Sequence, residues 1–159
     1  MERNTEGAAD EGLLAAVRAA LVMAAEPERA PAMQSYMKSS MPYLGVPKPA
    51  RERALRPVFA ARVLPDAAIW SATVLALWRR AQFREERYAA IDLTGHRAYL
   101  AYQQSETLGL YDEMITTGAW WDYVDEVAVR RVGPLLSAWP GVIRPGSPRR
   151  VWRPSNLEG

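Results

Sequence analysis

The chain has 159 residues, of which 49% are hydrophobic and 24% charged, as is typical of one globular domain with its own core. It has no cysteine, which excludes disulfides and thiolate metal sites and favours a reducing, cytoplasmic compartment. A single histidine argues against a zinc enzyme, and no segment is long and apolar enough to predict a membrane span. We therefore expect no metal and no membrane partner.

Arginine dominates the basic residues, although the net charge is only +2. Six arginines lie between Glu126 and Gly159, and the same stretch has only two acidic residues. The planar guanidinium binds phosphate oxygens in pairs, so this bias fits a phosphate-bearing partner. The alternative is a codon bias that places arginine wherever a solvated cation is needed.

Apolar spacing and caps predict helices along the chain. Asp10 precedes a helix with an apolar stripe of Leu13, Leu14, Val17 and Leu21. A short second helix is expected around Met33–Met37, followed by a loop from Met41 to Pro49. A third helix begins near Pro49 and contains Pro57, and Asp66 caps a fourth with Trp70, Val74, Leu77 and Trp78 on one face.

The second half also shows helical spacing. The pattern predicts a helix over Arg84–Tyr99, with Tyr88, Ile91 and Leu100 as inward candidates. Ser105 begins a further helix, and Thr116 or Thr117 caps another from about Trp120 to Val132. No stretch alternates like a strand with hairpin turns. We therefore predict an all-α fold in which antiparallel helix pairs stack as a HEAT-like α-solenoid.

Three regions follow from these patterns. Residues 1–10 are polar and predict a disordered tail, and residues 11–140 form the helical-repeat domain. Residues 141–159, rich in proline, glycine and arginine, predict an irregular basic segment.

Chemistry-bearing residues are few. In Trp120-Trp121-Asp122-Tyr123-Val124-Asp125, Trp121 and Asp125 share a helical face and can hold a cation by charge and by the indole ring. Alternatively, one tryptophan fills the core and the acids face water. Asp122 fits a role at the helix N-terminus.

Other polar residues have ordinary explanations. The cluster Arg84–Tyr88 fits helix-surface ion pairs. His96 fits a capping or surface position, because it has no evident catalytic partner. Tyr36, Lys38 and Tyr43 either contact a nucleic-acid backbone or pack and solvate.

Several segments together resemble the AlkD-type DNA alkylation repair glycosylases, which are HEAT-like all-α proteins. The matching stretches are Pro31–Lys38, Leu44-Gly45-Val46 with Pro49–Arg53, Leu77-Trp78, Arg84–Asp92 and Thr116–Asp125. The similarity covers about residues 12 to 140, and Trp-Trp-Asp-x-Val-Asp is its most specific element.

The resemblance implies a cofactor-independent hydrolase that excises cationic N3- and N7-alkylated purines, such as 3-methyladenine and 7-methylguanine, from double-stranded DNA. It implies that Asp125 stabilises the sugar and directs water, that Trp121 packs beside the sugar, and that Tyr36 faces DNA. We also predict DNA contacts by Trp120, Lys38, Arg149 and Arg150.

Family members continue for several more helices, so the resemblance implies a C-terminally truncated member. This departure leaves an alternative function open. The chain could be a non-catalytic helical-repeat module that binds DNA or protein.

Overall fold

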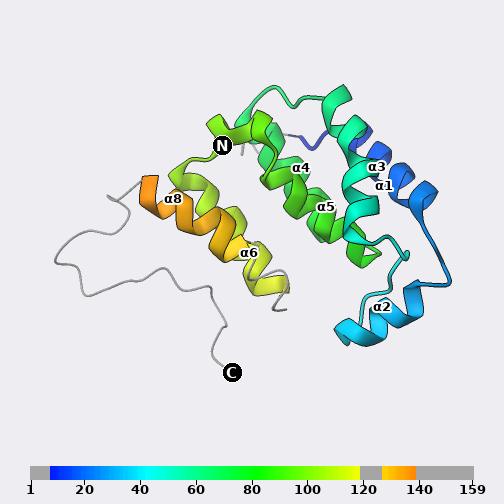
Figure 1. The fold of residues 1–159 in the computed structure, drawn as a ribbon. Helices are drawn as coiled ribbons and strands as arrows, with labels where there is room; N and C mark the ends of the chain where they lie inside the picture. The colour runs from blue at the N-terminus through cyan, green and yellow to red at the C-terminus, as the bar shows by residue number, and fades with distance from the viewer. Residues whose placement is uncertain (1–7, 119–126, 139–159) are drawn as a thin grey trace, which may run out of the picture. The chain divides into compact units, whose positions relative to one another are not determined.

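Figure 1 shows a computed structural model of the chain, which describes residues 8–118 and 127–138. The chain divides into two compact units, Met1–Leu93 and Thr94–Gly159. The predictions for residues 1–7 and 141–159 lie outside the described residues. Within the described ranges no helix has the length and apolar composition needed to cross a bilayer.

The all-α prediction is confirmed, because the regular elements of the described residues are all helical. In the first unit, α1 (Glu11–Ala24) packs against α3 (Lys48–Ala61) and α4 (Ala67–Arg79), and α5 (Arg84–Thr94) follows. This layering of short helices is consistent with the predicted α-solenoid.

The predicted caps and apolar stripes of the first unit are confirmed. Asp10 accepts a hydrogen bond from the Leu13 backbone N–H at 3.0 Å, and Asp66 accepts one from Ile69 at 2.8 Å. The core is made by the apolar faces of the packed helices, including Leu13, Leu14, Val17, Leu21, Leu55, Phe59, Trp70, Val74, Leu77 and Trp78.

The short second helix is α2 (Ala30–Met37), which begins with Pro31 in its first turn. It contains no buried residue and extends beyond the packed helices of its unit in Figure 1. Pro31, Ala32, Ser35 and Tyr36 are exposed, so one face of the helix is open to solvent.

The predicted helix over Arg84–Tyr99 is wrong at its end. α5 stops at Thr94, and a 3₁₀ segment, η1 (Arg97–Tyr102), starts after His96, whose ring nitrogen Nδ1 accepts the Ala98 N–H at 3.2 Å. Gly95 is a poor helix former at this break. The new geometry buries Tyr99 and leaves Leu100 69% exposed, so the inward placement of Leu100 is also wrong. The capping role of His96 is confirmed.

The second unit continues with η2 (Ser105–Thr107) and α6 (Leu108–Gly118). The cap predicted at Thr116 or Thr117 is wrong, because α6 runs through both residues. The Thr117 hydroxyl donates to the Glu113 carbonyl at 2.6 Å, a bond that threonine can make inside a helix. A π-helical turn, η3 (Ala128–Val132), then leads into α8 (Gly133–Ala138).

Candidate nucleic-acid interface

Two predicted DNA-contacting residues, Tyr36 and Lys38, lie together at the end of α2. Tyr36 is 82% exposed, and Lys38 is exposed as the residue that ends the helix. The remaining predicted site residues fall in parts of the chain outside the described residues: Trp120, Trp121, Asp125, Arg149 and Arg150.

Lys38 has a left-handed backbone conformation, with φ 50° and ψ 41°. The Lys38 N–H donates to the Ser35 carbonyl at 3.2 Å, and the Ser39 N–H donates to the Gln34 carbonyl at 3.1 Å. These two bonds form a Schellman motif, which normally places glycine at the position of Lys38. A lysine here costs about 1 kcal/mol of backbone strain. The strained turn directs the chain away from α2 at its last residue.

The segment after Lys38 is fixed through the buried hydroxyl of Ser39. This oxygen donates to the Met41 carbonyl at 2.8 Å and accepts from the Arg84 guanidinium at 3.1 Å. The Arg84 backbone N–H also donates to the Pro42 carbonyl at 2.9 Å. The first residue of α5 therefore holds the chain that leaves α2.

Further along the same loop, residues 44–46 bind the carboxylate of Glu85, which is 0% exposed. It accepts backbone N–H groups from Leu44 at 2.9 Å, Gly45 at 2.9 Å and Val46 at 3.1 Å. Hydrogen bonds from several backbone N–H groups replace the water that a buried carboxylate loses. Gly45 has φ +87°, and a Cβ there would lie 2.0 Å from the Glu26 carbonyl oxygen, so the loop requires glycine.

Tyr88 joins this loop to α3. Its hydroxyl lies 3.0 Å from that of Tyr43 and accepts a bond from Arg84 at 3.1 Å. The guanidinium of buried Arg51, on α3, lies 4.9 Å from the Tyr88 ring centre and pairs with Asp92 at 2.8 Å. A network of ion pairs and hydrogen bonds therefore connects α3, α5 and the loop after α2.

The prediction of helix-surface pairs in Arg84–Tyr88 is wrong. Arg84, Glu85 and Glu86 are 3%, 0% and 3% exposed, and each of them has at least one partner from a segment far away in sequence. Local spacing could not reveal those partners. The available signal was the joint presence of Leu44-Gly45-Val46 and Arg84-Glu85 among the stretches that resemble one family.

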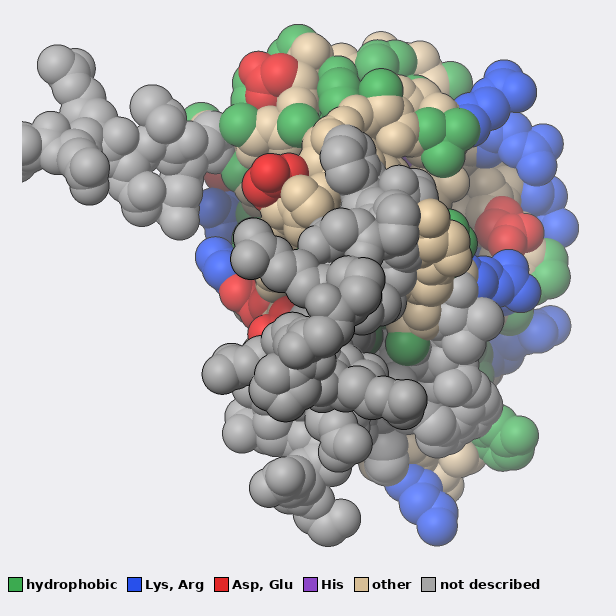
Figure 2. All heavy atoms as spheres, turned by 90° about the vertical axis from the view of Figure 1, so that its left-hand side faces the viewer, with side chains coloured by type: hydrophobic (Ala, Val, Ile, Leu, Met, Phe, Trp, Pro, Cys, Tyr) green, Lys and Arg blue, Asp and Glu red, His purple; other side chains and the backbone are tan. Residues whose placement is uncertain are grey.

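The surface carries separate groups of charge. In Figure 2, Lys and Arg side chains gather along one side of the face that is drawn. Exposed basic residues of the first unit include Lys38, Lys48, Arg53 and Arg56. Across residues 8–118 and 127–138, no three His, Asp or Glu side chains come close enough to hold a metal ion.

The fold is thus an all-α, solenoid-like scaffold whose α2 presents an exposed tyrosine and, at its end, an exposed lysine, just before a loop held by buried polar residues. A sequence profile of the DNA alkylation repair enzyme family matches residues 17–144, and the chain belongs to this family. Membership indicates a role in DNA repair and an interaction with DNA. The match spans Tyr36, Lys38 and the Trp120–Asp125 motif, whereas Arg149 and Arg150 lie beyond it. A comparison with curated proteins gave no significant match.

Proposed function

We propose that the protein is a DNA glycosylase that excises cationic N3- and N7-alkylated purines from double-stranded DNA. The observation that carries the proposal is the family match, which spans the complete Trp-Trp-Asp-x-Val-Asp motif at residues 120–125. In this proposal Asp125 stabilises the oxocarbenium-like sugar and positions water, and Trp121 packs beside the sugar.

Excision of a cationic base requires few catalytic groups. An alkylated purine already carries a positive charge, so it leaves without protonation by a strong general acid. The departing base passes its positive charge to the sugar, which a carboxylate stabilises electrostatically. Water then attacks the sugar, and the same carboxylate orients that water. No step in this sequence requires a metal or an organic cofactor.

The exposed end of α2 supplies a plausible physical basis for DNA contact in this proposal. Tyr36 offers a stacking or packing surface, and Lys38 offers a cation to a phosphate. Both residues lie just before a loop that is held through Ser39, Arg84 and the Glu85 carboxylate. A chain segment anchored before binding loses less conformational entropy when it meets DNA.

The test is release of 7-methylguanine or 3-methyladenine from alkylated duplex DNA. The intact protein should release base, and Asp125→Asn should reduce the rate about 100-fold or more, the usual effect of removing one electrostatic stabiliser. Asp122→Asn is the matched control, since it makes the same change three residues away and should retain most activity. No base release by the intact protein would contradict the proposal.

The second candidate is a non-catalytic DNA-binding module. One observation favours it: the contacts that hold the α2 segment all come from the first unit, independently of the motif at residues 120–125. Salt-dependent duplex binding without base release would identify this function. In that case Lys38→Ala should weaken binding and lower the salt dependence, while Asp125→Asn should leave both unchanged.

A further inference from the structure

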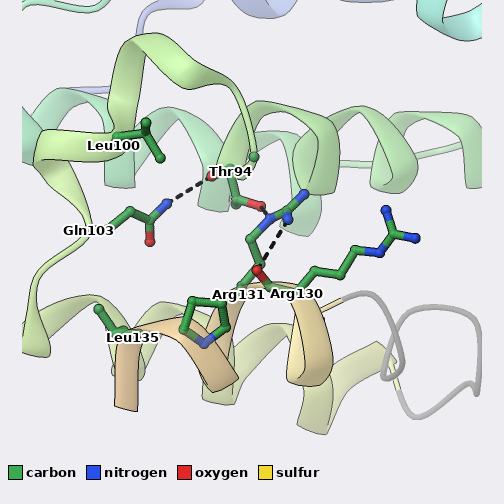
Figure 3. A pocket seen from close by; sticks show the side chains of 8 residues that line it. Thr94, Leu100, Gln103, Arg130, Arg131 and Leu135 are labelled. Carbon is green, nitrogen blue, oxygen red and sulfur yellow. Dashed lines mark hydrogen bonds between the residues drawn. The ribbon is translucent and has the colours of Figure 1, made fainter. Parts of the chain in front are cut away.

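A pocket of about 280 Å³ lies within the second unit. Apolar and polar side chains both line it (Figure 3). The apolar wall consists of Leu100, Pro134 and Leu135, and the polar wall includes Gln103, Arg130 and Arg131. Leu100 is 69% exposed, so an apolar surface is open to solvent at this site.

Arg131 is held in a defined position. Its Nε donates to the Thr94 hydroxyl at 3.0 Å, and Figure 3 shows the Arg131 side chain turned toward Thr94, while Arg130 extends away from both. The guanidinium lies directly over Gly95, where a Cβ would be only 2.1 Å from Nη2. The space occupied by the guanidinium exists because residue 95 has no side chain.

The amide of Gln103 is oriented by two hydrogen bonds. Its Nε2 donates to the Thr94 carbonyl at 2.8 Å, and its oxygen accepts the Tyr111 hydroxyl at 2.6 Å. Burial raises the pKa of Tyr111 to about 12, so the hydroxyl keeps its proton at neutral pH and acts as the donor. Hydrogen bonds within the protein therefore hold Gln103 and Arg131 in position.

We propose that this pocket binds a phosphate monoester attached to a compact apolar or planar group. The guanidiniums of two lining residues, Arg130 and Arg131, match the charge of a monoester, which is about −1.5 to −2 at neutral pH, better than that of a carboxylate. The apolar wall matches the attached group. The pocket is slightly smaller than drug-sized sites, which are roughly 300–1,000 Å³, so it suits a small ligand. The proposal does not depend on glycosylase activity.

Such a monoester has two sources: a free nucleoside monophosphate or the 5′-phosphorylated end of a DNA strand. Both present the same phosphate group next to a sugar and base. The first would make the pocket a small-molecule site, and the second would make it a site for strand ends.

Calorimetric titration with phenyl phosphate and with inorganic phosphate tests the pocket directly. Phenyl phosphate should bind about tenfold more tightly than inorganic phosphate, because only the ester reaches the apolar wall. Arg131→Gln should weaken both ligands about tenfold or more through loss of the planar fork. Leu100→Ala should weaken phenyl phosphate alone, and Arg97→Gln, an exposed arginine that does not line the pocket, should change neither.

Gly95→Ala provides a second perturbation, in which the polar and apolar side chains that line the pocket keep their chemical identity. The added methyl displaces the Arg131 guanidinium, so it should weaken phosphate binding as Arg131→Gln does, while a thermal melt verifies the fold of each variant. Absence of saturable phenyl phosphate binding by the intact protein would overturn the proposal. So would binding that neither variant alters.

Competition then separates the two sources. Displacement of phenyl phosphate by a 5′-phosphorylated duplex, but not by the same duplex with a 5′-hydroxyl, would support the strand-end site. Displacement by deoxyadenosine monophosphate without displacement by either duplex would support the free nucleotide. Equal displacement by both duplexes would contradict recognition of a monoester.

Discussion

Replacing Glu85 by glutamine keeps the size of a buried side chain but removes its charge and one acceptor oxygen. The remaining carbonyl oxygen can keep the bonds from Gly45 and Val46, which share one carboxylate oxygen. The new NH₂ group then faces the Leu44 N–H, which is a donor. One backbone donor loses its acceptor, and two bonds lose their charge assistance.

These losses set the size of the effect. An unsatisfied buried donor costs about 1–3 kcal/mol, and each remaining bond weakens by about 1 kcal/mol without the charge. The neutral side chain recovers part of the cost of burying a carboxylate. We expect the free energy of unfolding to fall by about 2–4 kcal/mol, a large part of the roughly 5–15 kcal/mol typical of a native protein.

Urea denaturation followed by tryptophan fluorescence measures this loss, and amide hydrogen exchange localises it. Exchange at Leu44, Gly45 and Val46 should accelerate in Glu85→Gln, because these amides lose their acceptor or its charge. Glu52→Gln, the same change at an exposed position on α3, is the control. A Glu85→Gln protein within about 0.5 kcal/mol of the parent, the usual range of surface substitutions, would refute the reasoning.

Three further predictions concern single positions. In a urea titration, Gly45→Ala should lower the free energy of unfolding by about 2 kcal/mol or more, because φ +87° is strained for alanine and the added methyl meets a backbone oxygen. Gly12→Ala is the control: its methyl meets only the end of a flexible arginine, so its free energy of unfolding should be nearly unchanged. The free energy of unfolding of Lys38→Gly, measured by urea titration, should exceed that of Lys38→Ala by about 1 kcal/mol, because glycine is not strained in the left-handed conformation. Both variants should lose the same amount of duplex affinity. Equal stabilities of the two variants would argue against backbone strain at Lys38. Burial raises the pKa of Tyr111 from 10.0 to about 12, so the folded state holds the phenol proton more tightly than the unfolded state does. This difference contributes up to about 3 kcal/mol of stability below pH 10, which is lost as the pH rises to 12. The stability of Tyr111→Phe should therefore be less sensitive to alkali, and a pH profile identical to that of the parent would contradict the burial effect.

Elements with a cap and an apolar stripe could be predicted from the sequence. Asp10 and Asp66 mark helix starts because the side chain of each accepts a hydrogen bond from one of the first backbone N–H groups of the helix that follows. The buried faces followed from spacing alone, because a helix turns its third and fourth neighbours to one side. These signals are local, so no tertiary information was needed.

The interior of the candidate site could not be predicted in the same way. Arg84, Glu85 and Glu86 have the spacing of surface ion pairs, and their burial depends on partners about 40 or more residues distant. The end of α5 was missed because Tyr99, three positions past His96, continues the apolar pattern while the backbone changes to a 3₁₀ segment. The catalytic assignments for Trp121 and Asp125 are predictions that base-release measurements address.

The hydrogen bonds from α5 to the loop after α2 have a consequence for the order of folding. Glu85 is separated from its three backbone partners by 39 to 41 residues, and Arg84 from Ser39 by 45. Closing such loops costs entropy before the bonds form, and domains fold from the N-terminus as they are synthesised. α1 can therefore take shape early, whereas Tyr36 and Lys38 reach their final positions only after α5 has left the ribosome. The segment proposed to touch DNA is thus completed late, when the first unit can already support it.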